Sequence, residues 1–238
     1  MKKAIVVGAT SGIGRQLALL LANSQYMVVI TGRRGLLLTE LQHLKPDNFI
    51  ASAFDVTSMA QIPLQLKKFA DELGGLDLLI MSAGTGELNP SLSPDIELQT
   101  VAVNVAGFTA VADWAFTFFE QQGSGHFAAI TSVAGIRGGR HSPAYNASKA
   151  YQVNYLQGLI QKAANLKVPV YVTDARPGFV DTPMAKGEGL FWVAPVEKAA
   201  MQIYTAIENK RKVVYITRRW RLVAYMIRLM PAVFYNRL

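Results

Sequence analysis

Short apolar runs alternate along this chain with longer segments that carry apolar residues at helical spacing. Seven runs have the length of a strand: residues 4–7, 27–31, 49–54, 76–81, 127–131, 168–174 and 213–217. The first six are continuously apolar, which is typical of strands covered by helices on both faces. Helices are expected near residues 12–24, 34–44, 58–73, 95–122, 143–166 and 195–209. This order predicts an α/β fold with a doubly wound parallel sheet of seven strands, flanked by helices and joined by right-handed crossovers.

The length and composition fit one domain that needs no disulfide. The chain has 238 residues, is 51% hydrophobic and contains no cysteine. A chain of this length can bury a large core, and no long linker or internal repeat divides it. We expect a single domain over residues 1–217, no metal centre and a reducing, cytoplasmic environment.

The beginning of the chain is interpreted as a strand rather than a signal peptide. Its apolar run, residues 4–7, is shorter than the apolar region of a signal peptide, and glycines follow at once. No segment supplies the roughly 18 uninterrupted apolar residues of a membrane span.

The net charge of +8 is concentrated in the C-terminal part. From Asn209 onward the chain has eight basic residues and no acidic one, so the preceding 208 residues hold 16 of each sign. A helical wheel of residues 218–238 separates Arg218, Arg221 and Arg228 from an apolar side. That side consists mainly of Trp220, Val223, Met226, Ile227 and Met230. The sequence therefore predicts a basic amphipathic helical extension over residues 218–238.

Three kinds of partner are considered for this extension. A basic amphipathic helix with aromatic residues suits the surface of an anionic membrane. Packing on the protein's own sheet or on a neighbouring subunit is the alternative, and both remain open. Nucleic acid fits less well, because a broad apolar face accompanies the charge.

A glycine-rich turn follows the first predicted strand. Residues 8–14 read GATSGIG, with Gly8, Gly12 and Gly14 preceding a helix. Glycines let the backbone approach a pyrophosphate, whose charge is stabilised at the helix N-terminus. The turn is interpreted as a dinucleotide site that also involves Thr10, Ser11 and Ile13. A tight strand–helix connection is the alternative.

The second predicted strand ends in two arginines, Arg33 and Arg34, and no acidic residue stands there. An acid at this place would bind the ribose hydroxyls of NAD, whereas a guanidinium can bind a 2′-phosphate through forked hydrogen bonds. The pair therefore favours NADP(H) as the cofactor. The alternative is a solvated pair of arginines at the start of a helix.

Three polar residues predict an acid–base centre. Tyr145 and Lys149 are four residues apart in a predicted helix, so they share one face. A nearby cation favours the phenolate and lowers the pKa of a tyrosine from its usual value of about 10. Ser132 lies on another segment, and its hydroxyl can hydrogen-bond an oxygen whose charge changes during a reaction.

These features are expected to meet at one edge of the sheet. The turns after residues 7, 31, 81, 131 and 174 all lie at the carboxyl ends of predicted strands, where ligands of such sheets bind. The turns contain residues 8–14, Arg33, Ala83–Gly84, Ser132 and Pro177–Gly178.

The ordered set of motifs resembles the short, single-domain branch of the short-chain dehydrogenase/reductase family. The matching positions lie between residues 3 and 217: Gly8-x3-Gly12-x-Gly14, Asp55-Val56, Ala83-Gly84, Asn104-Val105-Ala106-Gly107, Ser132, Tyr145-x3-Lys149 and Pro177-Gly178-x-Val180-x-Thr182. The chain shows two departures from the family pattern. Met81-Ser82 stands where asparagines are frequent, and Val7 replaces a usual threonine.

The resemblance implies a Rossmann fold and a catalytic tetrad. Tyr145 would be the general acid in reduction and the base in oxidation, and Lys149 would lower its pKa and hold the nicotinamide ribose. Ser132 would hydrogen-bond the substrate carbonyl. Asn104 would hold a water in a proton relay, although by itself it could equally cap or kink a helix.

The resemblance also implies contacts with the cofactor. Asp55 and Val56 are expected around the adenine and Thr182 at the carboxamide, and Asp55 could instead cap the helix that follows. Further cofactor contacts are expected from Ala83, Gly84, Pro177, Gly178 and Val180, besides Tyr145 and Lys149.

The reaction expected is NADP(H)-dependent interconversion of a ketone and a secondary alcohol. The alternative is a non-catalytic NADP(H)-binding sensor or a scaffold that docks membrane or partners. A nucleotide-sugar epimerase fits poorly, because the chain lacks a sizeable C-terminal substrate domain.

The substrate is expected to be hydrophobic or lipid-linked. Residues 183–194 fall where the family carries a substrate lid, and Met184, Leu190, Phe191 and Trp192 make it apolar. These aromatics could equally pack on the protein itself. The C-terminal part is loosely similar to bacterial reductases of lipid-linked or long-chain keto substrates. We expect a homo-oligomer in the cytoplasm, with peripheral contact at the inner face of the membrane as a further possibility.

Overall fold

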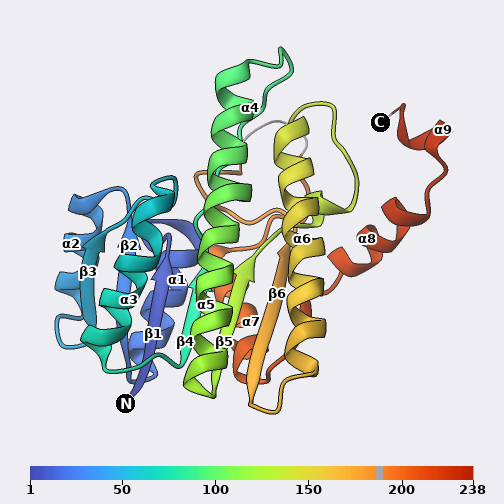
Figure 1. The fold of residues 1–238 in the computed structure, drawn as a ribbon. Coiled ribbons are helices and arrows are strands. Elements are labelled where there is room, and N and C mark those ends of the chain that lie inside the picture. The colour runs from blue at the N-terminus through green and yellow to red at the C-terminus, as the bar shows by residue number, and fades with distance from the viewer. Residues whose placement is uncertain (186–189, 238) are drawn as a thin grey trace.

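The computed structural model describes residues 1–185 and 190–237. Its centre is a parallel sheet in the order β3-β2-β1-β4-β5-β6-β7 (Figure 1). The strands are β1 Lys2–Val7, β2 Tyr26–Gly32, β3 Phe49–Ala53, β4 Leu78–Met81, β5 Gly125–Ile130, β6 Val170–Pro177 and β7 Val213–Ile216. The order reverses between β1 and β4, so the predicted doubly wound sheet of seven strands is confirmed.

Helices cover both faces of the sheet, in front of it and behind it (Figure 1). The helices of the described chain are α1 Gly12–Asn23, α2 Gly35–Leu44, α3 Ile62–Leu73, α4 Pro94–Val101, α5 Phe108–Gln122, α6 Pro143–Ala164 and α7 Val196–Glu208, followed by α8 Trp220–Leu229 and α9 Ala232–Tyr235 outside these layers. One apolar cluster joins the sheet to α3, α5 and α6, and the other joins it to α1, α2 and α7.

The continuous apolar runs of the strands follow from this arrangement. In β1, Ile5 and Val7 belong to one cluster, whereas Ala4 and Val6 belong to the other. Successive side chains of a strand point to opposite faces, so a strand with helices on both sides needs apolar residues at every position.

The predicted helix over residues 95–122 contains a change of helical type. α4 continues into a π-helical segment, η2 Ala102–Gly107, and then into α5. A π segment inside a helix is frequently found at a functional site. Asn104 lies in this segment and is buried.

The combined helix Pro94–Gln122 meets the length and composition criteria of a membrane span, with a mean hydropathy of 1.4 in its most apolar window. Polar residues such as Asn104 and Asp113 interrupt its apolar residues. Its side chains Phe108, Val111 and Phe119 are buried in the core against the sheet. We therefore interpret it as a core helix.

The C-terminal extension forms an arm that projects from the body (Figure 1). The predicted amphipathic helix is present as α8, and it ends before Pro231, after which α9 forms one further turn. The arm rises beside the carboxyl edge of the sheet, which lies at the top of Figure 1.

Candidate active site

The glycine-rich turn lies against the turn that follows β4. A Cβ on Gly8 would lie 2.7 Å from Ala83 Cα, and Gly8 has a φ of 93°, so only glycine fits this position. The amides of Gly8 and Ala9 both donate to Thr31 O at the end of β2. The turn is thereby fixed between β2 and β4, at the point where the strand order reverses.

The backbone amides at the N-terminus of α1 lack a side-chain cap. Ser11 occupies the N-cap with an extended backbone, yet its side chain makes no capping hydrogen bond. Amide groups of a first helical turn that lack such a cap can bind an anion, and the helix dipole favours a negative charge there. Gly12, at the first position, faces Thr182, whose Cγ2 would lie 3.2 Å from an added Cβ.

Arg34 closes over this turn from the end of β2. Its Nη2 donates to Ser11 Oγ at 2.8 Å and its Nε to Thr10 Oγ1 at 3.2 Å. Arg33 is exposed beside it. The structure therefore brings Thr10, Ser11 and Arg34 together at one side of the glycine turn, with a second guanidinium next to them.

Lys149 is the buried cation of the site. Its Nζ donates to Ile130 O at 3.1 Å and to Gln152 Oε1 at 2.9 Å, and only 5% of the residue is exposed. Burial lowers the pKa of Lys149 to about 8, and the negative charge of Asp174 partly opposes this shift. The ammonium lies 5.8 Å from the centre of the Tyr145 ring, so the two residues share one face of α6 as predicted.

Tyr145 and Ser132 meet at the same edge. Burial raises the pKa of the Tyr145 phenol, and a hydrogen bond from Ser132 opposes that rise. Ser132 is held by its own turn, since its Oγ accepts from the amide of Ala134 at 3.0 Å. The same hydroxyl approaches Pro177 O at 3.4 Å, which joins the end of β6 to the site.

Asn104 is anchored by four groups. Its Oδ1 accepts from the Thr85 amide at 2.9 Å, and its Nδ2 donates to Thr85 O and Ser148 Oγ. Its backbone oxygen accepts from Gln152 Nε2 at 2.8 Å. The side chain therefore connects the turn after β4 to α6 from within a π-helical segment.

Two glycines after β4 leave space for Asn104, Lys149 and Tyr145. A Cβ on Gly84 would lie 3.4 Å from Asn104 Oδ1 and 3.7 Å from Lys149 Nζ. A Cβ on Gly86 would overlap the Tyr145 ring, with 2.7 Å to Cε2. The turn after β4 thus passes along Asn104, Lys149 and Tyr145. Gly86 was not predicted from the sequence, where nothing marks its contact with Tyr145.

A buried ion pair lies beneath Lys149, and the sequence did not predict it. Asp174 in β6 is fully buried and accepts from Arg176 Nε at 2.6 Å and from Thr131 Oγ1 at 2.5 Å. Burial raises the pKa of Asp174, whereas Arg176, Thr131 and Lys149 oppose that rise. Thr131 directly follows Ile130, whose carbonyl holds Lys149.

The other predicted cofactor residues lie around this edge. Asp55 Oδ1 accepts from the amide and the hydroxyl of Thr57, so it stabilises a local turn and does not cap α3, whose N-cap is Gln61. Val56 contacts the π segment, because a Cβ on Gly107 would lie 3.0 Å from Val56 Cβ.

The loop after β6 connects the site to the arm. Gly178 donates to Ile216 O, and Val180 forms a bridge with Ala194. The Trp220 ring occupies the space where a Cβ on Gly178 would stand. The sequence did not predict this contact, since Gly178 and Trp220 belong to distant segments.

The predicted lid, residues 183–194, is described except for residues 186–189. Its Phe191 and Trp192 pack with Phe179 and Trp220, at ring distances between 5.1 and 6.2 Å. Both lid aromatics nevertheless stay exposed by more than 40%. Phe191 and Trp192 therefore pack on the protein and also present an apolar surface beside the candidate site.

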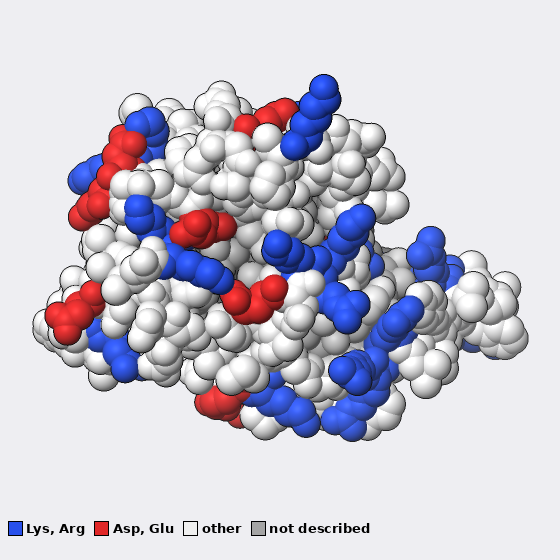
Figure 2. Space-filling view, turned by 90° about the horizontal axis from the view of Figure 1, so that it is seen from below, with Lys and Arg blue, Asp and Glu red and all other residues white. Residues whose placement is uncertain are grey.

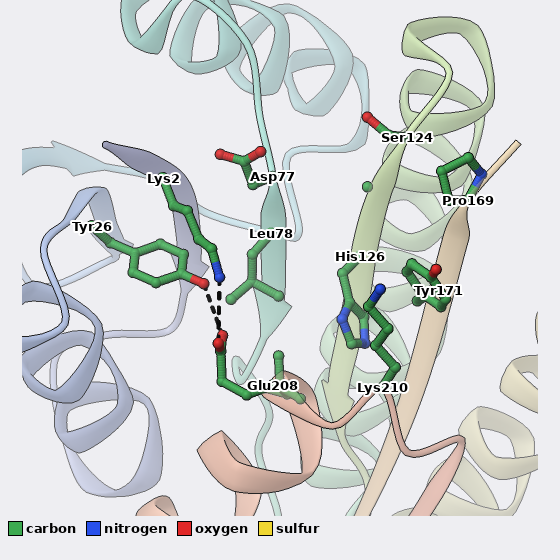
Figure 3. A pocket seen from close by; sticks show the side chains of 12 residues that line it. Lys2, Tyr26, Asp77, Leu78, Ser124, His126, Pro169, Tyr171, Glu208 and Lys210 are labelled. Carbon is green, nitrogen blue, oxygen red and sulfur yellow. Dashed lines mark hydrogen bonds and ion pairs between the residues drawn. The ribbon is translucent and has the colours of Figure 1, made fainter.

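A hollow of about 350 Å³ lies at the opposite, amino edge of the sheet (Figure 3). On one side Glu208 accepts from Tyr26 at 2.9 Å and pairs with Lys2 at 3.3 Å. On the other side His126 bonds Thr173 Oγ1 at 2.8 Å, and burial lowers the pKa of His126 to about 4. Because Thr173 donates its hydroxyl hydrogen to Arg211 O, His126 is the donor through Nε2.

The carboxyl edge fits a dinucleotide better than this hollow does. It has a glycine turn that a side chain would block, an uncapped helix N-terminus and neighbouring guanidinium groups. These features suit the pyrophosphate and a further phosphate. At the amino edge, Lys2, Tyr26 and Glu208 already satisfy one another.

Known proteins share this sequence and this fold. The family described as short chain dehydrogenase matches residues 2–190. An uncharacterized oxidoreductase of Staphylococcus saprophyticus is 35% identical over 190 residues, which cover 77% of this chain and 80% of the relative.

Two solved structures have the same fold at low sequence identity. A short chain dehydrogenase/reductase from Burkholderia phymatum in complex with NAD has a TM-score of 0.85 at 20% identity, over 94% of this chain and 92% of the other. ElxO with NADP bound has a TM-score of 0.78 at 21% identity, over 90% and 96%. With a family match over most of its length, this chain belongs to the short-chain dehydrogenase/reductase family of oxidoreductases.

Proposed function

We propose that this oxidoreductase uses NADP(H) to interconvert a ketone and a secondary alcohol, with Tyr145 as the acid–base group. The observation that supports it most is the convergence of Tyr145, Ser132, Asn104 and the buried ammonium of Lys149 beside the glycine turn. NADPH, when bound, supplies the hydride for the carbonyl carbon. The protein supplies orientation and the proton.

In the direction of reduction, the Tyr145 hydroxyl gives its proton to the carbonyl oxygen, and the Ser132 hydroxyl donates a hydrogen bond to the same oxygen. The ammonium of Lys149 stabilises the phenolate that remains. In the reverse direction the Tyr145 phenolate accepts the proton of the alcohol. Asn104 keeps the turn after β4 in place beside these groups through its bonds to Thr85.

Residues of the carboxyl edge would hold the cofactor. The glycine turn and the first turn of α1 suit the pyrophosphate, and Arg33 and Arg34 suit a 2′-phosphate. Asp55, Val56, Ala83, Pro177 and Thr182 are proposed to complete the site. The hydrogen bonds of Arg34 to Thr10 and Ser11 support NADP(H), since they hold a guanidinium at the side of the turn where the ribose phosphate is expected.

A hydrophobic carbonyl compound is the proposed substrate. Met184, Phe191 and Trp192 expose apolar surface next to the loop that carries Pro177 and Gly178. We further propose that the protein is cytoplasmic, that it forms a homo-oligomer, and that residues 218–238 give it contact with the inner face of the membrane. The alternative function is a non-catalytic NADP(H)-binding sensor or scaffold.

The reaction is tested by following NADPH absorbance with a panel of ketones that includes lipid-like ones. Replacing Tyr145 by Phe should lower turnover about 10²- to 10⁴-fold, because the proton donor is lost, with NADPH binding retained. Tyr151→Phe is the matched control, since Tyr151 lies on the same helix and bonds only Thr109 through its hydroxyl. Wild-type turnover in the Tyr145→Phe protein would refute the assignment. Tight cofactor binding without turnover on any ketone or alcohol would favour the sensor.

Cofactor preference is tested at the end of β2. An Arg33→Asp, Arg34→Asp protein should bind NADPH at least about tenfold more weakly relative to NADH, because two phosphate partners become carboxylates. Lys68→Asp, an exposed charge reversal on α3, is the control. An unchanged preference would show that these arginines do not read a 2′-phosphate.

A further inference from the structure

The arm formed by α8 and α9 carries apolar side chains on two opposite faces. The inner face is buried: Trp220, Val223 and Ala224 pack on the body, at helical spacing. Leu229 on the outer face is 79% exposed. The exposed apolar residues of the arm are Leu222, Tyr225, Met226, Leu229, Val233 and Phe234. The sequence wheel predicted one apolar face, whereas the structure shows a second one that the body does not cover.

The arm is held in a fixed orientation by the loop that follows Ser132. Arg137 donates to Ile227 O at 3.3 Å and to Met230 O at 2.6 Å, and its guanidinium stacks 4.5 Å from the Tyr235 ring. Tyr235 donates to Gly138 O at 2.6 Å. These hydrogen bonds fix the orientation of the arm, so its outer face points away from the body.

Positive charge surrounds the outer face. The exposed arginines on or next to the arm are Arg218, Arg219, Arg221, Arg228 and Arg237, and no acidic residue follows Glu208 in the sequence. Figure 2 shows Lys and Arg along the side of the body from which the arm projects, whereas Asp and Glu lie mainly on the other side. An apolar stripe flanked by arginines is complementary to acyl chains beneath anionic headgroups.

We infer that the outer face of α8 and α9 docks on an anionic lipid bilayer. A second copy of the chain fits this face less well, because a two-fold contact brings the same patch of each copy together and would set these arginines against their own counterparts. The inference rests on the membrane contact proposed above, for which it names the docking face and the lipid charge, and it does not depend on the reaction. Trp220 covers Gly178 and Arg137 follows Ser132, so docking would bring the site's entrance close to the bilayer.

The test is flotation of the full chain with phosphatidylglycerol vesicles and with phosphatidylcholine vesicles. Binding to the anionic vesicles is expected, weakening at high salt because charge contributes to it. Replacing Leu222, Leu229 and Phe234 by Ser should weaken binding at least about 100-fold, since three apolar side chains lose their burial. Arg221→Gln and Arg228→Gln should weaken it about fivefold each.

The matched control replaces three exposed leucines elsewhere, Leu36, Leu44 and Leu64, by Ser. It should bind the vesicles as the wild type does, and turnover of a water-soluble ketone should be unchanged in both triple variants. The inference is overturned if the wild type does not float, or if the two triple variants float equally. It is also overturned if light scattering shows an oligomer that only the outer-face variant dissociates, because a second copy then occupies the face.

A separate observation concerns Gln152, which is buried between two groups of the tetrad. Its Oε1 accepts from Lys149 Nζ at 2.9 Å, and its Nε2 donates to Asn104 O at 2.8 Å. Only 1% of Gln152 is exposed. The family resemblance places a relay water near Asn104, and here an amide side chain takes the backbone oxygen of that residue.

We propose that Gln152 is a positioning residue for Lys149, which it ties to the π-helical segment. The ammonium has neutral partners in Ile130 O and Gln152, and the charged or titratable groups around it are Tyr145 on α6 and Asp174 on β6. Without the amide, the ammonium loses one of these two acceptors and the bond that fixes its distance from Asn104. This proposal rests on the proposed function.

Gln152→Leu should lower turnover about 10- to 100-fold through displacement of Lys149, with the folded state retained. Gln152→Glu places a carboxylate at Lys149 and should move the basic limit of the pH–rate profile upward by about one unit. Gln157→Leu, exposed on the same helix, is the control. Unchanged turnover and an unchanged pH profile in both Gln152 variants would refute the proposal. Activity of the wild type, measured alongside, separates this outcome from failure of the proposed function.

Discussion

Lys149 and His126 are two buried basic residues at opposite edges of the sheet, and burial leaves them in different charge states at neutral pH. Burial lowers the pKa of both, to about 8 for Lys149 and to about 4 for His126. At neutral pH Lys149 keeps its charge, whereas His126 is neutral. A buried charge that is kept costs folding free energy, here about 3 kcal/mol from the lowered pKa. His126 avoids nearly all of that cost.

The difference extends to the other groups at the two edges. At the carboxyl edge the hydrogen-bond partners of the buried ammonium within residues 1–185 and 190–237 are neutral, and glycines keep space open beside it. At the amino edge, Lys2 and Tyr26 donate to Glu208, and neutral His126 donates to Thr173. A buried charge with neutral hydrogen-bond partners is typical of a functional site, so the comparison supports the function proposed for the carboxyl edge.

The largest expected effect is that of Lys149→Met, which replaces the ammonium by an apolar chain of similar length. Turnover should fall at least about 100-fold, because the acid–base tyrosine loses its cation. The free energy of unfolding should rise by up to about 3 kcal/mol at pH 7, because the buried charge is removed. Urea denaturation and the ketone assay measure the two effects. A Lys149→Met protein that lost stability and kept its turnover would contradict the catalytic role proposed for the carboxyl edge.

The amino edge should show its effect in the pH dependence of stability. The pKa of His126 is lower in the folded state, so the unfolded chain binds more protons between pH 6.5 and pH 4. Stability should therefore fall as the pH drops through this window, by about 3 kcal/mol from this group. His126→Gln can keep the bond to Thr173 and should remove that contribution, with turnover unchanged. His43→Gln, at an exposed position, is the control, and this protein should lose as much stability on acidification as the wild type.

The smallest expected effect concerns the acid beneath Lys149. Asp174→Asn removes a negative charge that raises the pKa of Lys149, so this pKa should fall by about one unit. NMR titration of carbon-labelled lysine side chains measures it, and the Lys149→Met protein identifies the resonance. An unchanged pKa of Lys149 would mean that Asp174 interacts with Arg176 and Thr131 without affecting the charge of Lys149.

Much of this arrangement could be predicted from local patterns. Continuous apolar runs predicted strands buried on both faces, and β1 and β4 are buried in this way. The glycine turn and the spacing of Tyr145 and Lys149 predicted the two sides of the site, because turn geometry and helical periodicity are local properties. Gln152 could have been found from the same rule, since it lies three residues after Lys149 on one helix.

Other features depend on contacts between distant segments. The π-helical segment at Asn104 departs from a pattern that predicted one regular helix. Gly86 matters through the Tyr145 ring, and Trp220 matters through Gly178. Contacts between such distant segments leave no periodic pattern in the sequence from which they could be predicted.

The amino-acid sequence alone was enough to predict the parallel sheet, the glycine turn at its carboxyl edge, the shared helix face of Tyr145 and Lys149 and the basic character of the C-terminus. These follow from hydrophobic periodicity, backbone freedom and side-chain chemistry, which are properties of short segments. Three features became visible only in the folded chain: Arg34 bonds the turn, Asp174 lies near Lys149, and the arm buries one apolar face and exposes another. Those outcomes depend on which surfaces meet when the chain folds, and that is set by the packing of the whole domain.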